Sequence, residues 1–182
     1  MILTDSKKYA VEVVDDHIFF RKYNKILYPE FFTSKVYHSD YVYDELFPVM
    51  FITDYSPASQ FDMLQETSKD TNDRNILCVA DRGRKFHGYK NRKWKALPGN
   101  LHLSMKLSPH KSPPSMYKGL VIIAAVSVCK TIEKVLGIKT GIKWVNDILV
   151  DNKKVGGFLT KTRSESGKVN NAFIGIGVNI EA

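Results

Sequence analysis

Short apolar runs separated by polar and turn-forming residues predict alternating strands and helices along the middle of the chain. Ser56-Pro57 and Ser59 form a helix-start signal for a helix over residues 60–66. From Met116, apolar side chains recur at helical spacing until Gly137, a predicted C-cap, which gives a core helix of about 20 residues. The strands predicted in this part are residues 47–54, 76–80 and 100–107.

The strand at residues 100–107 alternates leucine or methionine with polar residues, the period-two pattern of a half-buried strand. We expect the leucines to face the core. His102, on the polar side, is expected to lie at the surface.

The tail of the chain predicts three further strands, residues 142–150, 154–162 and 169–180. Asp151-Asn152 suits a tight two-residue hairpin turn, because both residue types tolerate positive φ. The summed elements predict an α+β fold, with a mixed or antiparallel sheet and helices packed on one face. Residues 1–45, rich in tyrosine and phenylalanine, are expected to form an N-terminal extension packed on a body of residues 46–182.

Positive charge is concentrated in the body. The chain has a formal net charge of +8, yet residues 1–45 hold 6 Lys/Arg against 8 Asp/Glu. The densest basic window, residues 82–95, holds seven basic residues and no acid, and it leaves the end of a predicted buried strand, where binding loops are often found. A solvated loop, a nucleic-acid site and a site for a nucleotide or another small anion are the open interpretations.

Several classes of protein are disfavoured by what the chain lacks. The longest uncharged apolar stretch, residues 119–129, is shorter than the roughly 20 residues that span a membrane, and the N-terminus has no apolar core for export. The histidines have no zinc-type spacing, and neither a P-loop nor a Gly-x-Ser-x-Gly elbow is found. The two cysteines are expected to be reduced thiols of a cytoplasmic protein.

Charged residues and glycines interrupt the tail strands. In the KWVND motif, strand alternation would place Lys143 and Asp147 on one face, where they could pair with each other or present an oriented cation to an anionic ligand. Lys154 follows the predicted hairpin turn. Gly156-Gly157 and the glycines of residues 174–180 indicate either close packing or the floor of a ligand site.

Five motifs, in this order and spacing, resemble those of the biotin protein ligases. They are ADRGR with NRKW (residues 80–84 and 91–94), PGNLHLS (98–104), KWVND (143–147), KVGGFL (154–159) and IGIGVN (174–179). The resemblance covers residues 47–180 and implies a fold like that of the class II aminoacyl-tRNA synthetases and biotin synthetases. It also implies an enzyme that activates biotin with ATP and Mg²⁺ to biotinyl-5'-AMP and transfers biotin to a lysine of an acceptor domain of a carboxylase.

The resemblance assigns a role to each matching residue. The catalytic cations would be Lys143, Arg84 and Lys154, which stabilise negative charge at the reacting phosphate and carboxylate. The substrate-binding residues would be Arg82, Gly83, Cys78, Ser59, Gly156 and Gly157. The ATP-binding residues would be Trp94, which stacks on adenine, with Asn146, Asp147 and Asn179.

Departures from the family pattern leave two alternatives open. Cys78 stands where the family has a glutamine, and residues 56–59 replace its Ser-Thr-Asn near the ureido ring, which favours lipoate or another acid as substrate. The chain ends soon after the last motif, without the small C-terminal β-barrel of typical members, which favours a non-catalytic homologue that binds a nucleotide or a protein. No DNA-binding helix-turn-helix is found in residues 1–45, so neither DNA nor a membrane is an expected partner.

Overall fold

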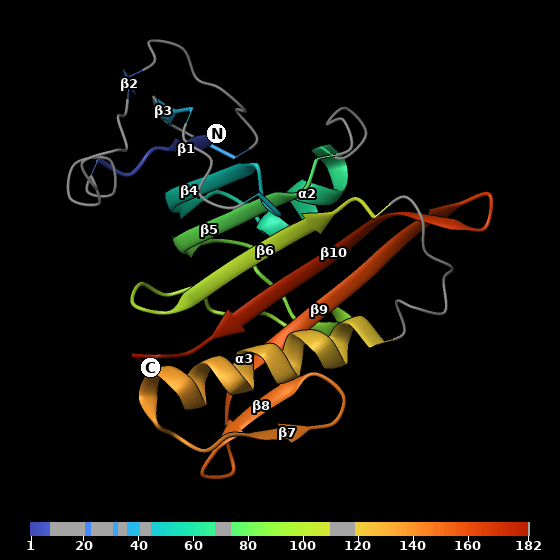
Figure 1. Ribbon diagram of the computed structural model, residues 1–182. Helices are drawn as coiled ribbons and strands as arrows, with labels where there is room; N and C mark the ends of the chain where they lie inside the picture. Colours follow the sequence, from blue (N-terminus) through green and yellow to red (C-terminus); the bar gives the residue numbers. More distant parts are fainter. Residues whose placement is uncertain are drawn as a thin grey trace.

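The sheet that organises the molecule is seen in a computed structural model, which describes residues 1–7, 21–22, 31–32, 36–40, 45–67, 74–109 and 119–181. Its strands are β1 (Ile2–Thr4), β2 (Arg21–Lys22), β3 (Tyr37–Ser39), β4 (Val49–Ser56), β5 (Ile76–Gly83), β6 (Leu101–Leu107), β7 (Gly141–Lys143), β8 (Asp147–Val150), β9 (Lys153–Glu165) and β10 (Lys168–Val178). The helices are α2 (Gln60–Thr67) and α3 (Leu120–Leu136), with a short 3-10 turn, η1, at Tyr89–Asn91. The strands form one sheet in the order β2-β3-β1-β4-β5-β6-β10-β9-β8-β7 (Figure 1).

The sheet is mixed, and the two helices cover opposite faces of it. β4 runs parallel to β1 and β5, whereas β6 to β10 pair antiparallel, so the α+β prediction is confirmed. On β10, Phe173 packs in a cluster with Phe61 of α2, while its neighbours Ala172 and Ile174 pack with α3. Successive strand residues point to opposite faces of a sheet, so α2 covers one face and α3 the other (Figure 1). The expectation that the helices pack on one face is therefore wrong.

Two apolar clusters flank the sheet, one against each helix. The cluster beneath α2 also contains Leu3 of β1 and the buried side chains of Phe31, Phe32 and Val36. β1 lies between β3 and β4, which brings the described part of residues 1–45 into the same sheet as the rest of the chain. The cluster beneath α3 is built on Ala124, Ala125 and the β9 residue Phe158, with other apolar side chains around them.

The predicted end of the long helix is confirmed. Gly137 has φ 68° and donates its N–H to the Glu133 carbonyl, an αL termination that glycine adopts without a Cβ penalty. The predicted start at Met116 lies outside the described residues. In the part of the chain that the structure describes, neither helix has the length and apolar character that crossing a membrane requires.

The predicted single strand at residues 142–150 is wrong, because the chain reverses within it. Residues 144–146 form a turn, and β7 pairs antiparallel with β8 so that Lys143 lies directly opposite Asp147. The predicted turn at Asp151-Asn152 is confirmed, with φ values of 48° and 60°. The turn between β9 and β10 is made by Ser166-Gly167, both with positive φ.

The polar face of β6 is buried, which reverses the prediction for this strand. His102, Ser104 and Lys106 are 1%, 4% and 1% exposed, whereas the four apolar residues of the strand are only half-buried. The polar face lies on the side of α2, which packs on β6 and β10, while α3 packs on β7 to β10 and leaves the apolar face of β6 partly open. The alternation of apolar and polar residues correctly divided β6 into two faces. Which of these faces is covered depends on the packing of α2 and α3, which are distant from β6 in the sequence.

We expect the core beneath α2 to dominate stability. Phe173→Ala removes a fully buried ring and should lower the free energy of unfolding by about 3–5 kcal/mol, since the cavity left behind adds to the lost burial. Urea denaturation followed by circular dichroism measures the change. Ile123→Ala, at a position 60% exposed on α3, is the control and should stay within about 0.5 kcal/mol of the parent; equal losses in both variants would contradict this core.

Candidate functional site

A cavity of about 360 Å³ opens on the face of the sheet that carries α2. One row of directly opposed residues crosses the sheet through its floor: Thr53, Ala80, His102, Gly177, Gly157, Asp147 and Lys143. Opposed residues share a face of the sheet, so the row brings residues of all five sequence motifs side by side. The histidine, both glycines and the aspartate line the cavity.

Glycines form the cavity floor because a Cβ at these positions would meet side chains that pack directly on the sheet backbone. A Cβ at Gly177 would lie 2.7 Å from Cε2 of the Trp94 indole, and one at Gly175 would lie 3.1 Å from the Phe61 ring. A Cβ at Gly157 would stand 3.5 Å from Nζ of Lys154. The glycines of the last motifs therefore serve close approach by aromatic and cationic side chains that line the cavity.

A bulge in β9 directs Lys154 into the cavity. The pairing with β8 shifts between Ile148 and Leu149, so that Lys154 opposes Leu149 while Gly157 opposes Asp147. Two residues then intervene between Lys154 and Gly157, yet both lie on the cavity face, which is a common effect of a bulge beside a functional site. Lys154 Nζ lies 2.6 Å from Oδ1 of Asp147, so the carboxylate orients the ammonium.

Asn146 is fixed to β9 from two sides. Its Nδ2 donates to the Phe158 carbonyl at 3.2 Å, and its own carbonyl accepts from the Phe158 N–H at 3.0 Å. These bonds hold the turn between β7 and β8 against β9. Asn146 and Asp147 therefore enter the cavity from a position that the strand backbone defines.

The basic window, residues 82–95, folds over one wall of the cavity as a small hairpin. The backbone N–H of Trp94 donates to the Phe86 carbonyl, and the backbone N–H of Gly88 donates to the Arg92 carbonyl. A Cβ at Gly83 would lie 2.7 Å from the Ser56 carbonyl oxygen, so only glycine lets the chain leave β5 this close to β4.

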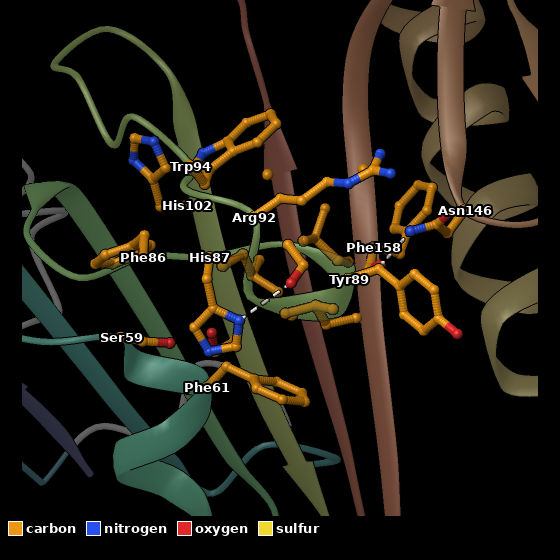
Figure 2. A pocket seen from close by; sticks show the side chains of 18 of the residues that line it. Ser59, Phe61, Phe86, His87, Tyr89, Arg92, Trp94, His102, Asn146 and Phe158 are labelled. Atoms are coloured by element: carbon orange, nitrogen blue, oxygen red, sulfur yellow. Dashed lines mark hydrogen bonds between the residues drawn. The ribbon is translucent and has the colours of Figure 1, made fainter.

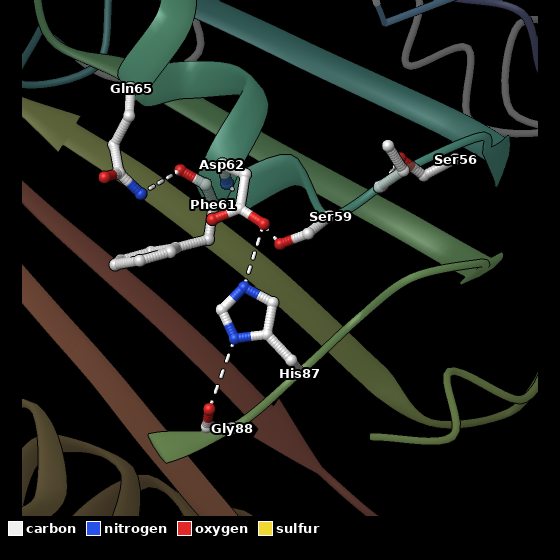
Figure 3. A network of polar contacts seen from close by, with 8 residues as sticks. Ser56, Ser59, Phe61, Asp62, Gln65, His87 and Gly88 are labelled. Atoms are coloured by element: carbon white, nitrogen blue, oxygen red, sulfur yellow. Dashed lines mark hydrogen bonds and ion pairs between the residues drawn. The ribbon is translucent and has the colours of Figure 1, made fainter. Parts of the chain in front are cut away.

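A histidine fastens this hairpin to α2. His87 Nε2 lies 2.8 Å from Oδ2 of Asp62 and Nδ1 lies 3.2 Å from the Gly88 carbonyl (Figure 3). Ser59 stands at the start of α2. Its carbonyl accepts a hydrogen bond from the Met63 N–H, and its hydroxyl oxygen accepts one from the Asp62 N–H. Ser59 is buried and lines the cavity, so the predicted helix start also delivers a hydroxyl to the site.

Six of the residues predicted from the sequence come together in this cavity. They are Ser59, Trp94, Asn146, Asp147, Lys154 and Gly157. They arrive from α2, the basic hairpin, the turn before β8, and β9. Their convergence could bind an anion at Lys154 and an apolar or aromatic group beside Trp94.

The other predicted residues lie outside the cavity lining. Lys143 ends the floor row at its outer edge, Arg82 and Arg84 are exposed where β5 passes into the hairpin, and Gly83 lies between them. Asn179 follows β10 and donates its N–H to the Val155 carbonyl.

Two further predicted residues are buried away from the cavity. Gly156 opposes Ile148 on the α3 face of the sheet, where a Cβ would lie 3.1 Å from the Gly177 carbonyl oxygen. Cys78 is fully buried in the cluster beneath α2, and burial raises the pKa of its thiol well above the usual range. Cys78 therefore presents a neutral, covered thiol.

Sequence reasoning missed the polar residues that the reversal of β6 brings inward. His102 lines the cavity and its Nδ1 lies 3.3 Å from the Ala80 carbonyl. Burial lowers the pKa of His102, although hydrogen bonding to the backbone at Ala80 and Asp81 opposes the shift. One signal for this was present in the sequence. β6 carries polar residues at every second position, and β10 carries glycines, Gly175 and Gly177, at the same spacing.

A resident metal is not indicated by the described residues. No group of three or more His, Cys, Asp or Glu side chains lies close enough together, in that part of the chain, to hold one. Asp147 is the carboxylate that lines the cavity.

Comparisons with known proteins point to one family. The profile of the Biotin/lipoate A/B protein ligase family matches residues 56–179, more than half of the chain. The bifunctional ligase/repressor BirA of Bacillus subtilis is 36% identical over 127 residues, which are 65% of this chain and 39% of that protein. The chain thus spans about two fifths of the length of this relative.

Solved structures give the same result for the fold. A biotin protein ligase of Leishmania major in complex with biotin superposes with a TM-score of 0.63 at 20% identity, over 74% of this chain and 57% of that chain. A biotin protein ligase of Aquifex aeolicus in complex with biotin and ATP gives a TM-score of 0.57 at 27% identity, over 75% and 54%.

We expect Gly177→Ala to displace the Trp94 indole, because the added Cβ would overlap it. Intrinsic fluorescence in a Trp144→Phe background reports Trp94 alone, and its emission should shift to the red as the ring becomes more exposed. Gly119→Ala is the control, since nothing lies within 4 Å of its Cβ position. An unchanged Trp94 spectrum in the Gly177 variant would contradict the packing described.

We expect His102 to make stability depend on pH. Its pKa in the folded chain lies below that of an exposed histidine, so the unfolded chain binds more protons just below about pH 6.5 and folding weakens as the pH falls. Between about pH 7.5 and 5.5, the free energy of unfolding should fall more in the parent than in His102→Gln, as urea titrations measure. The same pH dependence in both proteins would refute a buried, neutral imidazole.

Proposed function

The chain belongs to the biotin/lipoate A/B protein ligase family, and on this premise we propose that it activates biotin with ATP and transfers it to a protein lysine. In the first step a carboxylate oxygen of biotin attacks the α-phosphorus of ATP, and the bond to the bridging oxygen of the β-phosphate breaks. The products are biotinyl-5'-AMP and pyrophosphate. In the second step a neutral lysine amine of the acceptor attacks the acyl carbon, and AMP leaves with the electron pair of the anhydride bond.

Lys154 carries this proposal. Its ammonium is held by Asp147 over a glycine floor, in a cavity large enough for an organic acid. In the first step the carboxylate and the α-phosphate, both negative, must approach each other. A fixed cation between them favours the transition state over the separated reactants, because the charges are closest there.

We assign Lys143, Arg82 and Arg84 to the rim of the site. Lys143 stands at the outer end of the floor row, one strand beyond Asp147. By strand alternation Arg82 lies on the same face as Ala80, the β5 member of that row. Long flexible cations at a rim can reach the phosphates of a bound nucleotide without a preformed contact.

The nucleotide is assigned to the neighbourhood of Trp94 and Asn146. Trp94 offers an indole face for stacking on adenine, and Asn146 an amide held by β9. Asn179 would bind near the ribose and phosphate, and Gly83 would let the hairpin backbone approach the ligand. Mg²⁺ would enter with ATP, since Mg²⁺ sites are commonly made of phosphates, water and one or two carboxylates, and Asp147 supplies one.

We further propose that the acceptor is the biotin-accepting domain of a carboxylase and that the enzyme works in the cytoplasm. Two cysteines without a disulfide in the described chain agree with a reducing compartment. The absence of a DNA partner remains a prediction, because most of residues 1–45 lies outside the described residues.

The experiment is the exchange of labelled pyrophosphate into ATP. We expect exchange that depends on biotin and Mg²⁺, because forming the adenylate is reversible while the intermediate stays bound. Lipoate and octanoate, run in parallel, should support much less exchange. Exchange with lipoate and none with biotin would replace biotin as the substrate, and no exchange with any acid would reject adenylate formation.

Lys154→Met should lower the maximal rate of biotin-dependent exchange about 100- to 1000-fold, the effect of removing one well-placed charge stabiliser. Lys153→Met is the matched control: Lys153 opposes Val150 on the same side of the bulge as Lys154, but strand alternation places it on the opposite face of the sheet, and it does not line the cavity. Its exchange rate should stay within about twofold of the parent. Similar losses in both variants would show that charge at this end of β9 acts without the orientation that the bulge provides.

A further inference from the structure

The basic hairpin, residues 82–95, has features that by themselves do not favour a fixed conformation. It holds seven basic residues and no acid, so its charges repel one another. Lys85, Lys90 and Asn91 have φ values of 58°, 55° and 56°, in the left-handed region that is unfavourable for most residues with a side chain. Contacts between the hairpin and the rest of the chain must therefore hold it in place.

Two of these contacts are made by aromatic side chains. The Phe86 ring lies edge-on to His102 of β6, with ring centroids 5.5 Å apart, and the Trp94 indole covers Gly177 of β10. The backbone N–H of Trp94 donates to the Phe86 carbonyl, so the two contacts act together. Apolar contacts are not directional, and they define the position of the hairpin only loosely.

The third contact, between His87 and Asp62 of α2, is directional. His87 Nε2 lies 2.8 Å from Oδ2 of Asp62, and because a carboxylate only accepts, the hydrogen of this bond is on Nε2. The imidazole is 22% exposed and the carboxylate 45%, and hydrogen bonds to a charged group are stronger than neutral ones. His87 also forms an isolated bridge with Lys93, so the bond fixes the hairpin beside Trp94.

The bond closes a ring of contacts that begins and ends on β10. The ring runs through Gly175, Phe61, Asp62, His87, Trp94 and Gly177. Figure 2 shows the Trp94, His87 and Phe61 side chains following one another along this wall of the cavity, and Figure 3 shows the bond that joins α2 to the hairpin. Movement of the hairpin away from α2 would break the ring at this polar link.

We propose that His87 and Asp62 are positioning residues that hold the basic hairpin closed, so that the adenine site at Trp94 is formed before biotin binds. The inference rests on the proposed function, in which Trp94 stacks on adenine. A hairpin that a ligand has to order lowers the affinity of that ligand, and a second ligand that finds the hairpin ordered binds more tightly. Where the protein itself orders the hairpin this coupling is lost, and ATP and biotin bind nearly independently.

Titration calorimetry with α,β-methylene-ATP, whose bridge between the α- and β-phosphates cannot be cleaved, measures the coupling without turnover. In the parent, the dissociation constant should differ less than about twofold between no biotin and saturating biotin. His87→Leu removes the donor, so binding without biotin should weaken about 5- to 100-fold, and saturating biotin should restore most of the loss.

Further variants separate the bond from other effects of the substitution. His87→Gln should behave like the parent, because its amide nitrogen can donate to Asp62 from about the position of Nε2. Asp62→Ala should repeat the effect of His87→Leu, and the double variant should be no weaker than either single one, since both remove the same bond. A merely structural defect would lower affinity equally with and without biotin.

A second measurement needs no ligand. In a Trp144→Phe background, quenching of Trp94 fluorescence by acrylamide should increase in His87→Leu, as the indole loses its fixed place over Gly177, and should return to the parent value in His87→Gln.

His38→Leu is the matched control, because it breaks another contact between a histidine and an aspartate. His38 Nε2 lies 3.2 Å from Oδ1 of Asp40, at the far side of the sheet order from the hairpin. Nucleotide affinity and Trp94 quenching should both stay within about twofold of the parent.

The outcomes are distinct. Equal quenching in the parent and a folded His87→Leu variant overturns the positioning role and leaves the proposed function intact. Coupling in the parent as strong as in the variant overturns it too, because a ligand would then order the hairpin. If thermal melts show that His87→Leu does not fold, Asp62→Ala breaks the same bond from α2 and takes its place. A parent that binds neither the ATP analogue nor biotin defeats the proposed function itself, and quenching then decides whether the bond holds the hairpin.

Discussion

The site depends on the absence of side chains at three positions on the floor of the cavity. Gly157, Gly175 and Gly177 lie on three neighbouring positions of β9 and β10, and a Cβ at either of the last two would meet an aromatic ring. The rings of Phe61 and Trp94 can therefore stand directly over the backbone. A sheet of ordinary side chains at these positions would fill the space, and no cavity would remain between α2 and the basic hairpin.

Charge enters this cavity in an oriented form. The bulge turns Lys154 toward the floor, and the bond from Asp147 limits where its ammonium can lie. Asp147 is itself placed by the turn that Asn146 fastens to β9. The bulge, the ion pair and the turn thus determine together the position of one cation, an arrangement suited to a reaction in which negative charge must be stabilised at one point.

The buried polar face of β6 is the other unusual feature. Polar groups lose hydration when they are buried, and they are tolerated only where a partner replaces the water. The His102 imidazole has one partner in the Ala80 carbonyl, and its other nitrogen is buried without a partner among the described residues. A core built for stability alone would have placed the leucines of β6 on this side.

Local chemistry in the sequence determined the pieces, and distant packing determined their arrangement. Asp151-Asn152 and Gly137 were predictable because the backbone dihedrals of a turn or a cap depend on the residue itself and its nearest neighbours. The motif residues also gave the kind of chemistry, because lysines, glycines and an amide in that order are chemically distinctive. Which face of β6 is covered, which way Lys154 points past the bulge, and that α2 and α3 lie on opposite faces were decided only in the tertiary structure, since each depends on contacts between segments far apart in the chain.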